Sequence, residues 1–217
     1  MSAIDTGFND ARAQWDERFS RPGRWFGDEP NGFLRREAAR LRPAATVLSV
    51  ADGEGRNAIH LAERGLRVTA FDLSPVAVEK ARRWARERGA PVDFHVSDVD
   101  TWTWTPSAFD AVAAIFVQFA GPAMRARLFA GIWRTLKPGG LLLVHGYTPK
   151  QLEYRTGGPG RLDHLYTSQM LRELLPDAQW LLLSEHEQTL EEGSGHAGRS
   201  ALIDAVAVKP GGGAAGG

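Results

Sequence analysis

The sequence predicts one domain of the α/β class, built on an open, doubly wound sheet of about seven strands, mostly parallel with a C-terminal antiparallel strand. Three observations predict this fold. An apolar, β-branched run at 46–50 enters a glycine-rich turn and continues as an apolar-periodic helix. Strand and helix patterns then alternate as far as residue 147. Two final strand patterns are separated by a hairpin-length connection, so they should pair antiparallel.

The composition excludes several classes of protein. Lys and Arg together number 26, as do Asp and Glu, so no net field draws the chain to nucleic acid or to an anionic membrane. Neither an apolar run that could span a membrane nor a basic and then apolar leader is found, so we expect a cytoplasmic protein. Cysteine is absent and the six histidines are scattered, so we expect no disulfide and no metal site.

The glycine-rich turn is the strongest single motif. Gly53 and Gly55 allow a tight turn after the first strand and a close approach of the backbone to a ligand. The helix that follows points free N–H groups and a partial positive charge at the same place. The spacing also fits the dinucleotide fingerprint of the Rossmann fold. Alternatively, the glycines only let a helix pack closely against the sheet.

Two acidic residues follow the next two predicted strands. Asp72 ends the strand at 66–72, about 20 residues beyond the glycines, where the Rossmann fingerprint places a carboxylate that binds ribose hydroxyls. Its alternative role is a helix N-cap, which Ser74 fills better because Pro75 follows it. Asp98 ends the strand at 92–98 and could accept a hydrogen bond from the exocyclic amine of adenine.

The N-terminal region, residues 1–45, is expected to form a helical and aromatic arm. We expect a helix around 8–19, an irregular segment rich in Pro and Gly, and a helix at 32–41. Trp15 or Trp25 could stack on a ring or a cation as part of a lid over a ligand. Alternatively, these aromatic side chains only fasten the arm to the domain.

The main domain, residues 46–210, continues with further alternating elements. Helices are predicted at 75–88, 122–136 and 167–175, and strands at 109–119, 141–147, 180–190 and 200–208. Gln118 falls at the carboxyl end of the fourth strand, where open α/β sheets place ligands. A sharp turn at 136–140 should precede the fifth strand, and residues 191–199 should connect the last two. Residues 211–217, rich in glycine, are expected to be a disordered tail.

Together these motifs resemble the class I S-adenosylmethionine-dependent methyltransferases over residues 46–208. The turn Leu136-Lys137-Pro138-Gly139-Gly140 before the fifth strand matches that family well. The resemblance implies a Rossmann-like fold and S-adenosylmethionine as cofactor. It also implies that Ala51, Gly53 and Gly55 approach the methionine part of the cofactor, that Asp72 binds the ribose, that Asp98 and Val99 hold the adenine, and that Ile115 lines the pocket.

Within this family the chain resembles the branch of tellurite-resistance and thiopurine S-methyltransferases. The similarity lies in Trp15-Asp16-Glu17-Arg18, Pro30-Asn31, Gly53-Glu54-Gly55-Arg56-Asn57-Ala58, Gly146-Tyr147-Thr148-Pro149, Thr156-Gly157-Gly158-Pro159 and Gly195-His196-Ala197-Gly198-Arg199. One departure is Ser49, which stands where the family usually has an acid at the end of the first strand. We hypothesise that Asp52 supplies the missing carboxylate to the ammonium group of the cofactor.

The resulting prediction is a methyltransferase that acts on a small-molecule acceptor, such as a thiol, a chalcogen oxyanion or a similar soft nucleophile, by direct in-line transfer. The protein then has to align the acceptor and exclude water. The candidate catalytic residues are His196, Arg199 and Tyr147. The candidate cofactor-binding residues are Trp15, Arg18, Ala51, Asp52, Gly53, Gly55, Asn57, Asp72, Leu73, Ser74, Asp98, Val99, Ile115 and Gln118.

Two other functions remain open at this point, as does the choice between a monomer and a homodimer. The glycine fingerprint is compatible with an NAD(P)-dependent oxidoreductase, although no Tyr-x-x-x-Lys-like pair for hydride transfer is found. A non-catalytic S-adenosylmethionine-binding domain is the third possibility, because a fold does not determine an activity.

Overall fold

The computed structural model describes residues 3–211, with side chains described from residue 11 onward. Apart from Gly211, the predicted disordered tail lies outside the described residues. The helices are α1 (Ala3–Phe19), α2 (Gly32–Glu37), α3 (Arg56–Glu63), α4 (Pro75–Glu87), α5 (Pro122–Thr135), α6 (Gln151–Tyr154) and α7 (Ser168–Leu174), with 3₁₀ helices at Ala38–Arg40 and Leu162–His164. The strands are β1 (Thr46–Val50), β2 (Arg67–Asp72), β3 (Val92–Val96), β4 (Phe109–Ile115), β5 (Leu136–Tyr147), β6 (Gln179–Glu192) and β7 (His196–Val208).

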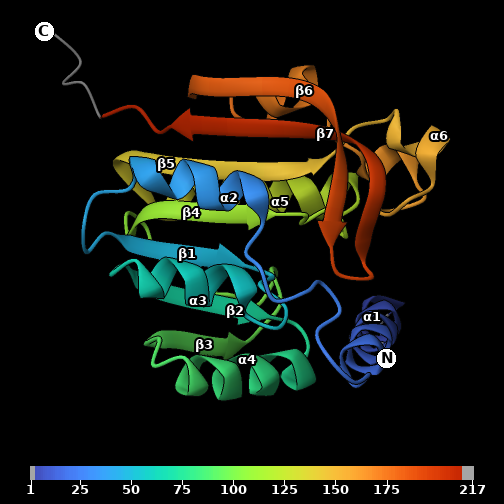
Figure 1. The fold of residues 1–217 in the computed structure, drawn as a ribbon. Coiled ribbons are helices and arrows are strands. Elements are labelled where there is room, and N and C mark those ends of the chain that lie inside the picture. The colour runs from blue at the N-terminus through green and yellow to red at the C-terminus, as the bar shows by residue number, and fades with distance from the viewer. Residues whose placement is uncertain (1–2, 212–217) are drawn as a thin grey trace, which may run out of the picture.

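All seven strands form one sheet in the order β3-β2-β1-β4-β5-β7-β6 (Figure 1). β1 to β5 are parallel, whereas β7 runs antiparallel to both β5 and β6. The chain winds outward from β1 to β2 and β3 and then returns to β4 on the other side of β1. This reversal is the topological switch point at which open α/β sheets bind ligands. The predicted fold class is confirmed.

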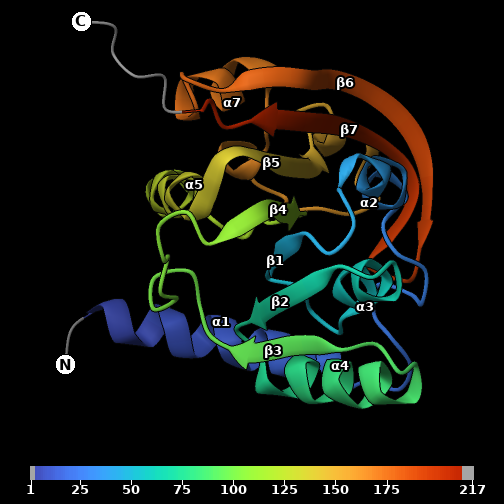
Figure 2. The ribbon, with the colours of Figure 1, turned by 90° about the vertical axis from the view of Figure 1, so that its left-hand side faces the viewer.

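Helices cover both faces of the sheet (Figure 2). One face packs against α2, α3 and α4 through a cluster that includes Val47, Val68 and Leu143. The other face packs against α5 and α7 through a cluster that includes Leu48, Val112 and Leu142. Neighbouring residues of each central strand thus point into opposite clusters and both are buried, as in a parallel sheet covered on both sides.

Helices α2, α4 and α7 each begin at a residue whose side chain caps them. The Ser74 hydroxyl accepts a hydrogen bond from the backbone N–H of Ala77 at the start of α4, and Pro75 occupies the first turn. The Asn31 side chain accepts from the N–H of Leu34 in the same way at the start of α2. The helices expected at 75–88 and 167–175 are found within a residue of their predicted ends.

The fourth strand is shorter than predicted. It was expected to continue to residue 119 but ends at Ile115, because Phe116 has a positive φ of 55° that turns the chain out of the sheet. The N–H of Phe116 still donates to the carbonyl of His145, at 2.7 Å, so the turn stays attached to β5. Residues 116–119 therefore form a loop at the carboxyl edge of the sheet.

The last three strands are longer than predicted. The expected turn at 136–140 is an irregularity within β5, where the pairing with β4 shifts between Phe109 and Ala111 and Gly139 has a φ of 76°. The expected connection at 191–199 is mostly strand, since Glu192 pairs with His196 and only 193–195 form the turn. Figure 1 shows the closed end of this hairpin bending past the carboxyl ends of the parallel strands.

Candidate active site

The turn after β1 places the backbone at the centre of the carboxyl edge. Three residues in it have positive φ: Ala51 at 50°, Gly53 at 61° and Gly55 at 93°. A Cβ added to Gly53 would meet the ring of Phe19 at 3.4 Å, so this glycine faces the arm. A Cβ added to Gly55 would lie 2.8 Å from the Cβ of Ala81 on α4. Gly55 thus allows close packing of the turn against α4, and it does not line the cavity described next.

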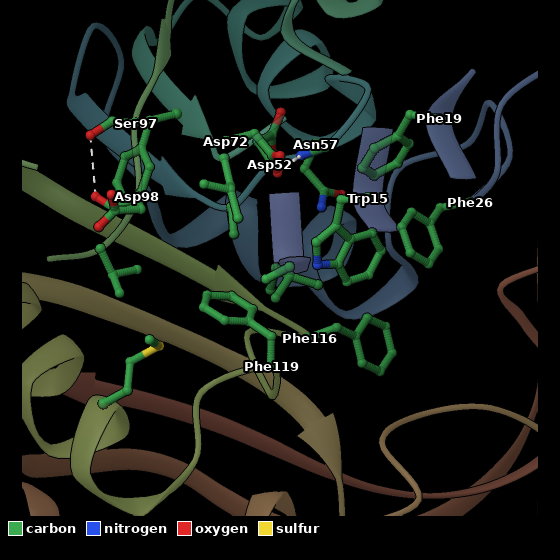
Figure 3. Close-up of a pocket in the computed structure, with 18 of the residues that line it drawn as sticks. Trp15, Phe19, Phe26, Asp52, Asn57, Asp72, Ser97, Asp98, Phe116 and Phe119 are labelled. Carbon is green, nitrogen blue, oxygen red and sulfur yellow. Dashed lines mark hydrogen bonds between the residues drawn. The ribbon is translucent and has the colours of Figure 1, made fainter. Parts of the chain in front are cut away.

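A cavity of about 880 Å³ opens beside this turn, at the switch point of the sheet (Figure 3). Its size lies within the range of about 300–1,000 Å³ usual for small-molecule sites. The wall is made by the ends of β1, β2, β3 and β4, by α1, by the start of α5 and by the first residue of β7. Segments far apart in the sequence therefore meet in one site.

Two buried carboxylates, Asp52 and Asp72, lie side by side in this wall (Figure 3). The Ser49 hydroxyl donates to Asp52 at 2.5 Å, and the two oxygens of Asp72 accept from the N–H groups of Gly53 and Ser74 at 2.8 and 2.9 Å. Burial raises the pKa of Asp52 from 3.8 to about 7 and that of Asp72 to about 6. Both groups would be stabilised as carboxylates by a ligand that brings a cation or hydroxyl donors.

A third carboxylate, Asp98, closes one end of the cavity. It accepts hydrogen bonds from the N–H groups of Asp100 and Thr101, at 2.6 and 2.9 Å, which fold the chain after β3 into a tight turn. Asp100 in turn forms a two-point ion pair with Arg127 of α5, at 2.8 and 2.9 Å. The turn thus holds Asp98 and the neighbouring Val99 against the cavity.

The opposite end of the cavity is aromatic. The imidazole of His196 lies between the rings of Phe26 and Phe116, with ring centroids 4.6 and 4.0 Å away. Trp15 and Phe19 of α1 stack on each other beside Phe26. In Figure 3 the labelled rings of Trp15, Phe19 and Phe26 gather at the end of the cavity away from Asp98.

His196 is a neutral imidazole held in one orientation. Its Nδ1 lies 2.7 Å from the hydroxyl of Tyr147, and the residue is only 7% exposed. Burial, helped by the charge of Arg56, lowers the pKa of His196 well below its usual value, and burial raises that of Tyr147. When Nδ1–H donates to the tyrosine oxygen, Nε2 carries the free lone pair.

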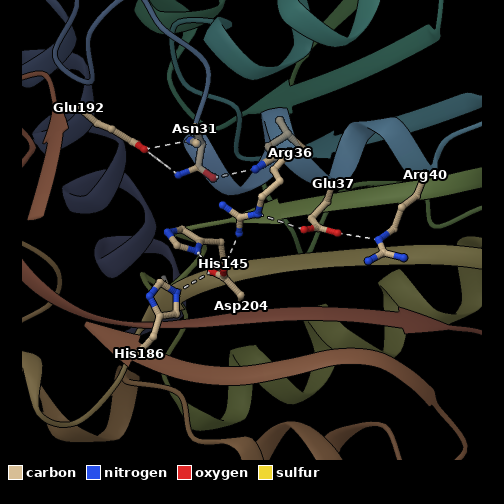
Figure 4. Close-up of polar contacts among 10 residues, drawn as sticks. Asn31, Arg36, Glu37, Arg40, His145, His186, Glu192 and Asp204 are labelled. Carbon is tan, nitrogen blue, oxygen red and sulfur yellow. Dashed lines mark hydrogen bonds and ion pairs between the residues drawn. The ribbon is translucent and has the colours of Figure 1, made fainter. Parts of the chain in front are cut away.

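The arm, defined here as residues 11–31, is fastened to the domain by buried carboxylates. Glu192 accepts from Arg56 at 2.7 Å and from the side chain of Asn31 at 3.0 and 3.2 Å (Figure 4). Arg56 also donates to the carbonyl of Phe26 at 2.8 Å. Glu54 accepts from the N–H of Trp25 at 2.7 Å. The aromatic end of the cavity therefore depends on contacts between the arm, α3 and the hairpin.

A second polar cluster lies behind the aromatic end, between α2 and the sheet (Figure 4). Asp204 of β7 is joined to His145 of β5 at 2.6 Å and to Arg36 of α2 at 2.7 Å. The ring of His145 meets that of Phe116 edge to face, with centroids 4.8 Å apart. This cluster contacts Phe116 through the ring of His145, which does not itself line the cavity.

The cavity brings together most of the residues that the sequence analysis proposed. The proposed residues that line it are Trp15, Ala51, Asp52, Gly53, Asn57, Asp72, Leu73, Asp98, Val99, Ile115 and His196. The structure thus assembles the glycine turn, the two strand-end acids and part of the arm around one space.

Three proposed cofactor-binding residues besides Gly55 lie outside the cavity lining. Arg18 stacks on the ring of Trp15, with its Cζ 4.7 Å from the ring centroid. Ser74 caps α4, and its hydroxyl donates to Asp16 of α1. Gln118 joins the end of β4 to β5, because it donates to the carbonyl of Tyr147 and accepts from the N–H of the same residue.

Two proposed catalytic residues also lie outside the lining. Tyr147 is buried behind His196 and reaches the site only through it. Arg199 is exposed, pairs with Glu187 at 2.7 Å, and lies 5.1 Å from the ring centroid of Tyr154. Because the hairpin is strand rather than loop here, Arg199 projects at a different place from His196. Arg199, which the sequence analysis named as a candidate catalytic residue, therefore lies away from this cavity.

Several lining residues were missed by the sequence analysis. They are Ala11, Phe19, Phe26, Arg56, Phe71, Ser97, Asp100, Thr101, Phe116, Phe119, Met124 and Arg127. Phe116 and Phe119 were missed because they continue the apolar sequence of β4, so the pattern predicts an uninterrupted strand through both of them. Arg56 directly follows Gly55 in the glycine-rich turn, so the motif could have identified it as a candidate site residue.

The described residues also bear on metal binding and on membrane insertion. Among the described residues, no group of His, Asp or Glu side chains could hold a metal ion. The helices in residues 3–211 include none that is long and apolar enough to cross a membrane.

Part of the chain is similar in sequence to known proteins. Residues 47–140 match the family model described as "Methyltransferase domain". The chain is 38% identical over 111 residues to a ubiquinone biosynthesis O-methyltransferase of Xanthomonas axonopodis pv. citri, and 36% identical over 129 residues to the S-adenosyl-L-methionine-dependent Diels-Alderase iccD of Talaromyces variabilis. These matches cover 49% and 55% of this chain but only 45% and 44% of the relatives. The chain thus spans less than half the length of these curated relatives.

The name of a third relative gives RNA as its substrate. The ribosomal RNA small subunit methyltransferase B of Xanthomonas campestris is 36% identical over 136 residues, which cover 49% of this chain and 31% of that protein. Similarity to these relatives therefore does not by itself define a class of acceptor.

Solved structures share the fold. A structure described as "Conversion of a Disulfide Bond into a Thioacetal Group during Echinomycin Biosynthesis" superposes with a TM-score of 0.75 at 19% identity, over 95% of this chain and 94% of that one. TehB from Haemophilus influenzae superposes with a TM-score of 0.69 at 15% identity, over 91% and 66%. At such identities the likeness shows the fold alone. Taken with the sheet order, these comparisons show a Rossmann-like fold shared with solved methyltransferase structures, in which residues 47–140 match a methyltransferase domain.

Proposed function

We propose that the protein transfers the methyl group of S-adenosylmethionine to a small-molecule acceptor with a soft nucleophile such as a thiol. The observation that carries the proposal is the position of Asp72 and Asp98 at the ends of adjacent strands, both lining the cavity beside the glycine turn. A carboxylate at each position suits the hydroxyls of a ribose and the exocyclic amine of an adenine. We also propose that the protein belongs to the branch of tellurite-resistance and thiopurine S-methyltransferases, which act on acceptors of this soft kind.

The cofactor would lie along the carboxylate wall of the cavity. Asp98 and Val99 would hold the adenine, Asp72 the ribose, and the turn at Ala51 and Gly53 the methionine part. Asp52 has no cationic partner within salt-bridge distance among the described residues, so we assign it to the ammonium group. A buried carboxyl without such a partner favours a ligand that supplies one.

The reaction needs alignment more than acid–base chemistry. The sulfonium supplies an activated methyl group, and the electron pair of the breaking bond stays on the sulfur of the cofactor. The chain has to hold the acceptor in line behind the methyl and to exclude water, which the aromatic lid of Trp15 and Phe26 can do. His196 would orient the acceptor through Nε2, and Tyr147 would position His196.

Titration calorimetry with S-adenosylhomocysteine, NAD and NADP tests the proposal. We expect saturable binding of S-adenosylhomocysteine and no heat with either dinucleotide. Asp72→Ala should weaken the binding at least tenfold, because the ribose loses its acceptor. Asp93→Ala, which removes an exposed acid of β3 outside the cavity, should leave the affinity unchanged.

Three results would contradict the proposal. The first is the absence of heat with S-adenosylhomocysteine for a protein that is folded by circular dichroism. The second is tight binding of NAD or NADP, which would favour an oxidoreductase. Binding without methyl transfer to any of a broad range of thiols, amines and hydroxyl compounds would favour a non-catalytic domain.

A further inference from the structure

The half of the cavity farthest from Asp98 is apolar and has no charge available for an acceptor. Its walls are the rings of Trp15, Phe19, Phe26 and Phe116, and its polar groups include the imidazole of His196 and the amide of Asn57. That imidazole is neutral because it is buried between two rings and close to the charge of Arg56. A ligand in this half is therefore met by aromatic surface and by neutral hydrogen-bonding groups.

The two cationic residues in the lining are already paired. Arg56 donates to the carboxylate of Glu192 and to the carbonyls of Phe26 and Glu29, and both members of the ion pair are largely buried. Arg127 forms the two-point pair with Asp100 at the far end. The described lining contains no other Arg and no Lys. An anionic acceptor would have to break one of these pairs to gain a cationic side chain as its partner.

The nearby acids work against an anion as well. Asp52 and Asp72 lie in the same cavity and would repel a second negative charge. A buried charge without a partner is costly, whereas apolar surface gains from burial. A cationic acceptor finds its possible partners, Asp52 and Asp72, already assigned to the cofactor.

We infer that the methyl acceptor is an uncharged molecule with an apolar body, bound against the aromatic end of the cavity. This inference rests on the proposed methyl transfer and specifies its acceptor. In the reaction the acceptor sulfur donates an electron pair to the methyl carbon while the bond from that carbon to the cofactor sulfur breaks. Positive charge thus passes to the acceptor, where the aromatic faces stabilise it, and the thiol proton then leaves to water.

Three probes of one shape test the inference. They are benzyl mercaptan, 4-(mercaptomethyl)benzoate and 4-(mercaptomethyl)benzylamine, which are neutral, anionic and cationic near neutral pH. Each is titrated into protein saturated with S-adenosylhomocysteine, and methyl transfer is then measured with S-adenosylmethionine. We expect the neutral probe to bind and to react at least tenfold better than either charged probe.

The order of the measurements separates this inference from the proposed function. Binding of S-adenosylhomocysteine is measured first, and its failure would refute the proposed function itself. Once that binding is established, equal or tighter binding of a charged probe overturns the inference. Failure of all three probes to bind also counts against it, because it would show that the aromatic end does not accept an apolar body.

A charge placed in the cavity provides an independent test. Phe119 lines the cavity and is 38% exposed, so its replacement should not disturb the core. Phe119→Lys adds a cation, and Phe119→Met is the neutral control of similar length. We expect Phe119→Lys to bind the benzoate probe at least tenfold tighter than Phe119→Met does, with equal affinity for benzyl mercaptan. Equal affinities for the benzoate probe would mean that charge does not determine the choice of acceptor.

Discussion

The two buried carboxylates set the electrostatics of the site. Asp52 and Asp72 are held by a hydroxyl and by backbone N–H groups rather than by cations, and burial raises the pKa of both. Each raised pKa means that the folded protein retains a proton that the unfolded chain would release at lower pH. A cationic ligand has to displace the proton from Asp52, so ligand affinity and pH are linked.

The first prediction follows from this linkage. Because Asp52 titrates at about 7, the affinity for S-adenosylhomocysteine should be full above about pH 8 and should fall by up to about tenfold per pH unit below 7. Asp72, at about 6, steepens the fall at still lower pH. Asp52→Asn should bind more weakly at pH 8 and should show a flat profile between about pH 6.5 and 8. Calorimetry across this pH range checks the prediction. A wild-type profile as flat as that of Asp52→Asn would exclude a pairing of Asp52 with the ammonium group of the ligand.

The second prediction concerns Tyr147, which touches the site only through His196. Tyr147→Phe removes the hydrogen bond that orients the imidazole. We expect kcat to fall roughly tenfold while the affinity for S-adenosylhomocysteine stays unchanged, because Tyr147 does not line the cavity. Tyr154→Phe, which changes a half-buried tyrosine that donates to Glu187 outside the cavity, is the matched control. An unchanged kcat for Tyr147→Phe would show that its hydrogen bond has no role in turnover.

At the scale of the elements, the hairpin of β6 and β7 completes the site. Its turn packs against the arm so closely that a Cβ on Gly193 would lie 2.3 Å from the backbone nitrogen of Gly27. Gly193 also has a φ of 64°, which disfavours any side chain. The same hairpin carries Glu192 and His196. A change at the turn should therefore reach the aromatic end of the cavity.

The third prediction uses this close contact. Gly193→Ala should displace the arm, lower the thermal stability and weaken binding of S-adenosylhomocysteine several-fold. Gly89→Ala is the control, because Gly89 has a similar φ of 62° but nothing within 4 Å of an added Cβ. Gly89→Ala should lower the free energy of unfolding by about 1 kcal/mol, through backbone strain alone. Thermal melts and limited proteolysis of the arm compare the two. Equal behaviour would mean that the hairpin and the arm are not coupled.

The same elements show where sequence patterns stop being informative. The alternation of strand and helix and the caps at Ser74 and Pro75 are local signals, so the order and most boundaries of the elements could be predicted. The length of β4 could not, because only the positive φ of Phe116 ends it and its apolar neighbours give no sign of this. Arg199 was misplaced for a related reason: a polar, glycine-containing connection was interpreted as loop, although tertiary pairing extends both strands through it.

For the whole molecule, the acidic half of the cavity was more predictable than the aromatic half. Asp72 and Asp98 stand at strand ends, and the parallel topology alone brings such ends to one edge. The aromatic end is assembled from α1, the segment after it, the loop after β4 and the start of β7. No local pattern links these four segments, because their contacts depend on how the hairpin bends and where the arm is held.

The central claim is that one nucleoside lies across the carboxyl ends of β2 and β3, with its ribose on Asp72 and its adenine on Asp98. A crystal structure of the complex with S-adenosylhomocysteine tests it most directly. The account predicts ribose hydroxyls within hydrogen-bonding distance of the Asp72 carboxylate and the adenine amine at Asp98. Density for the ligand outside this cavity, or with both carboxylates turned away from it, would contradict the account.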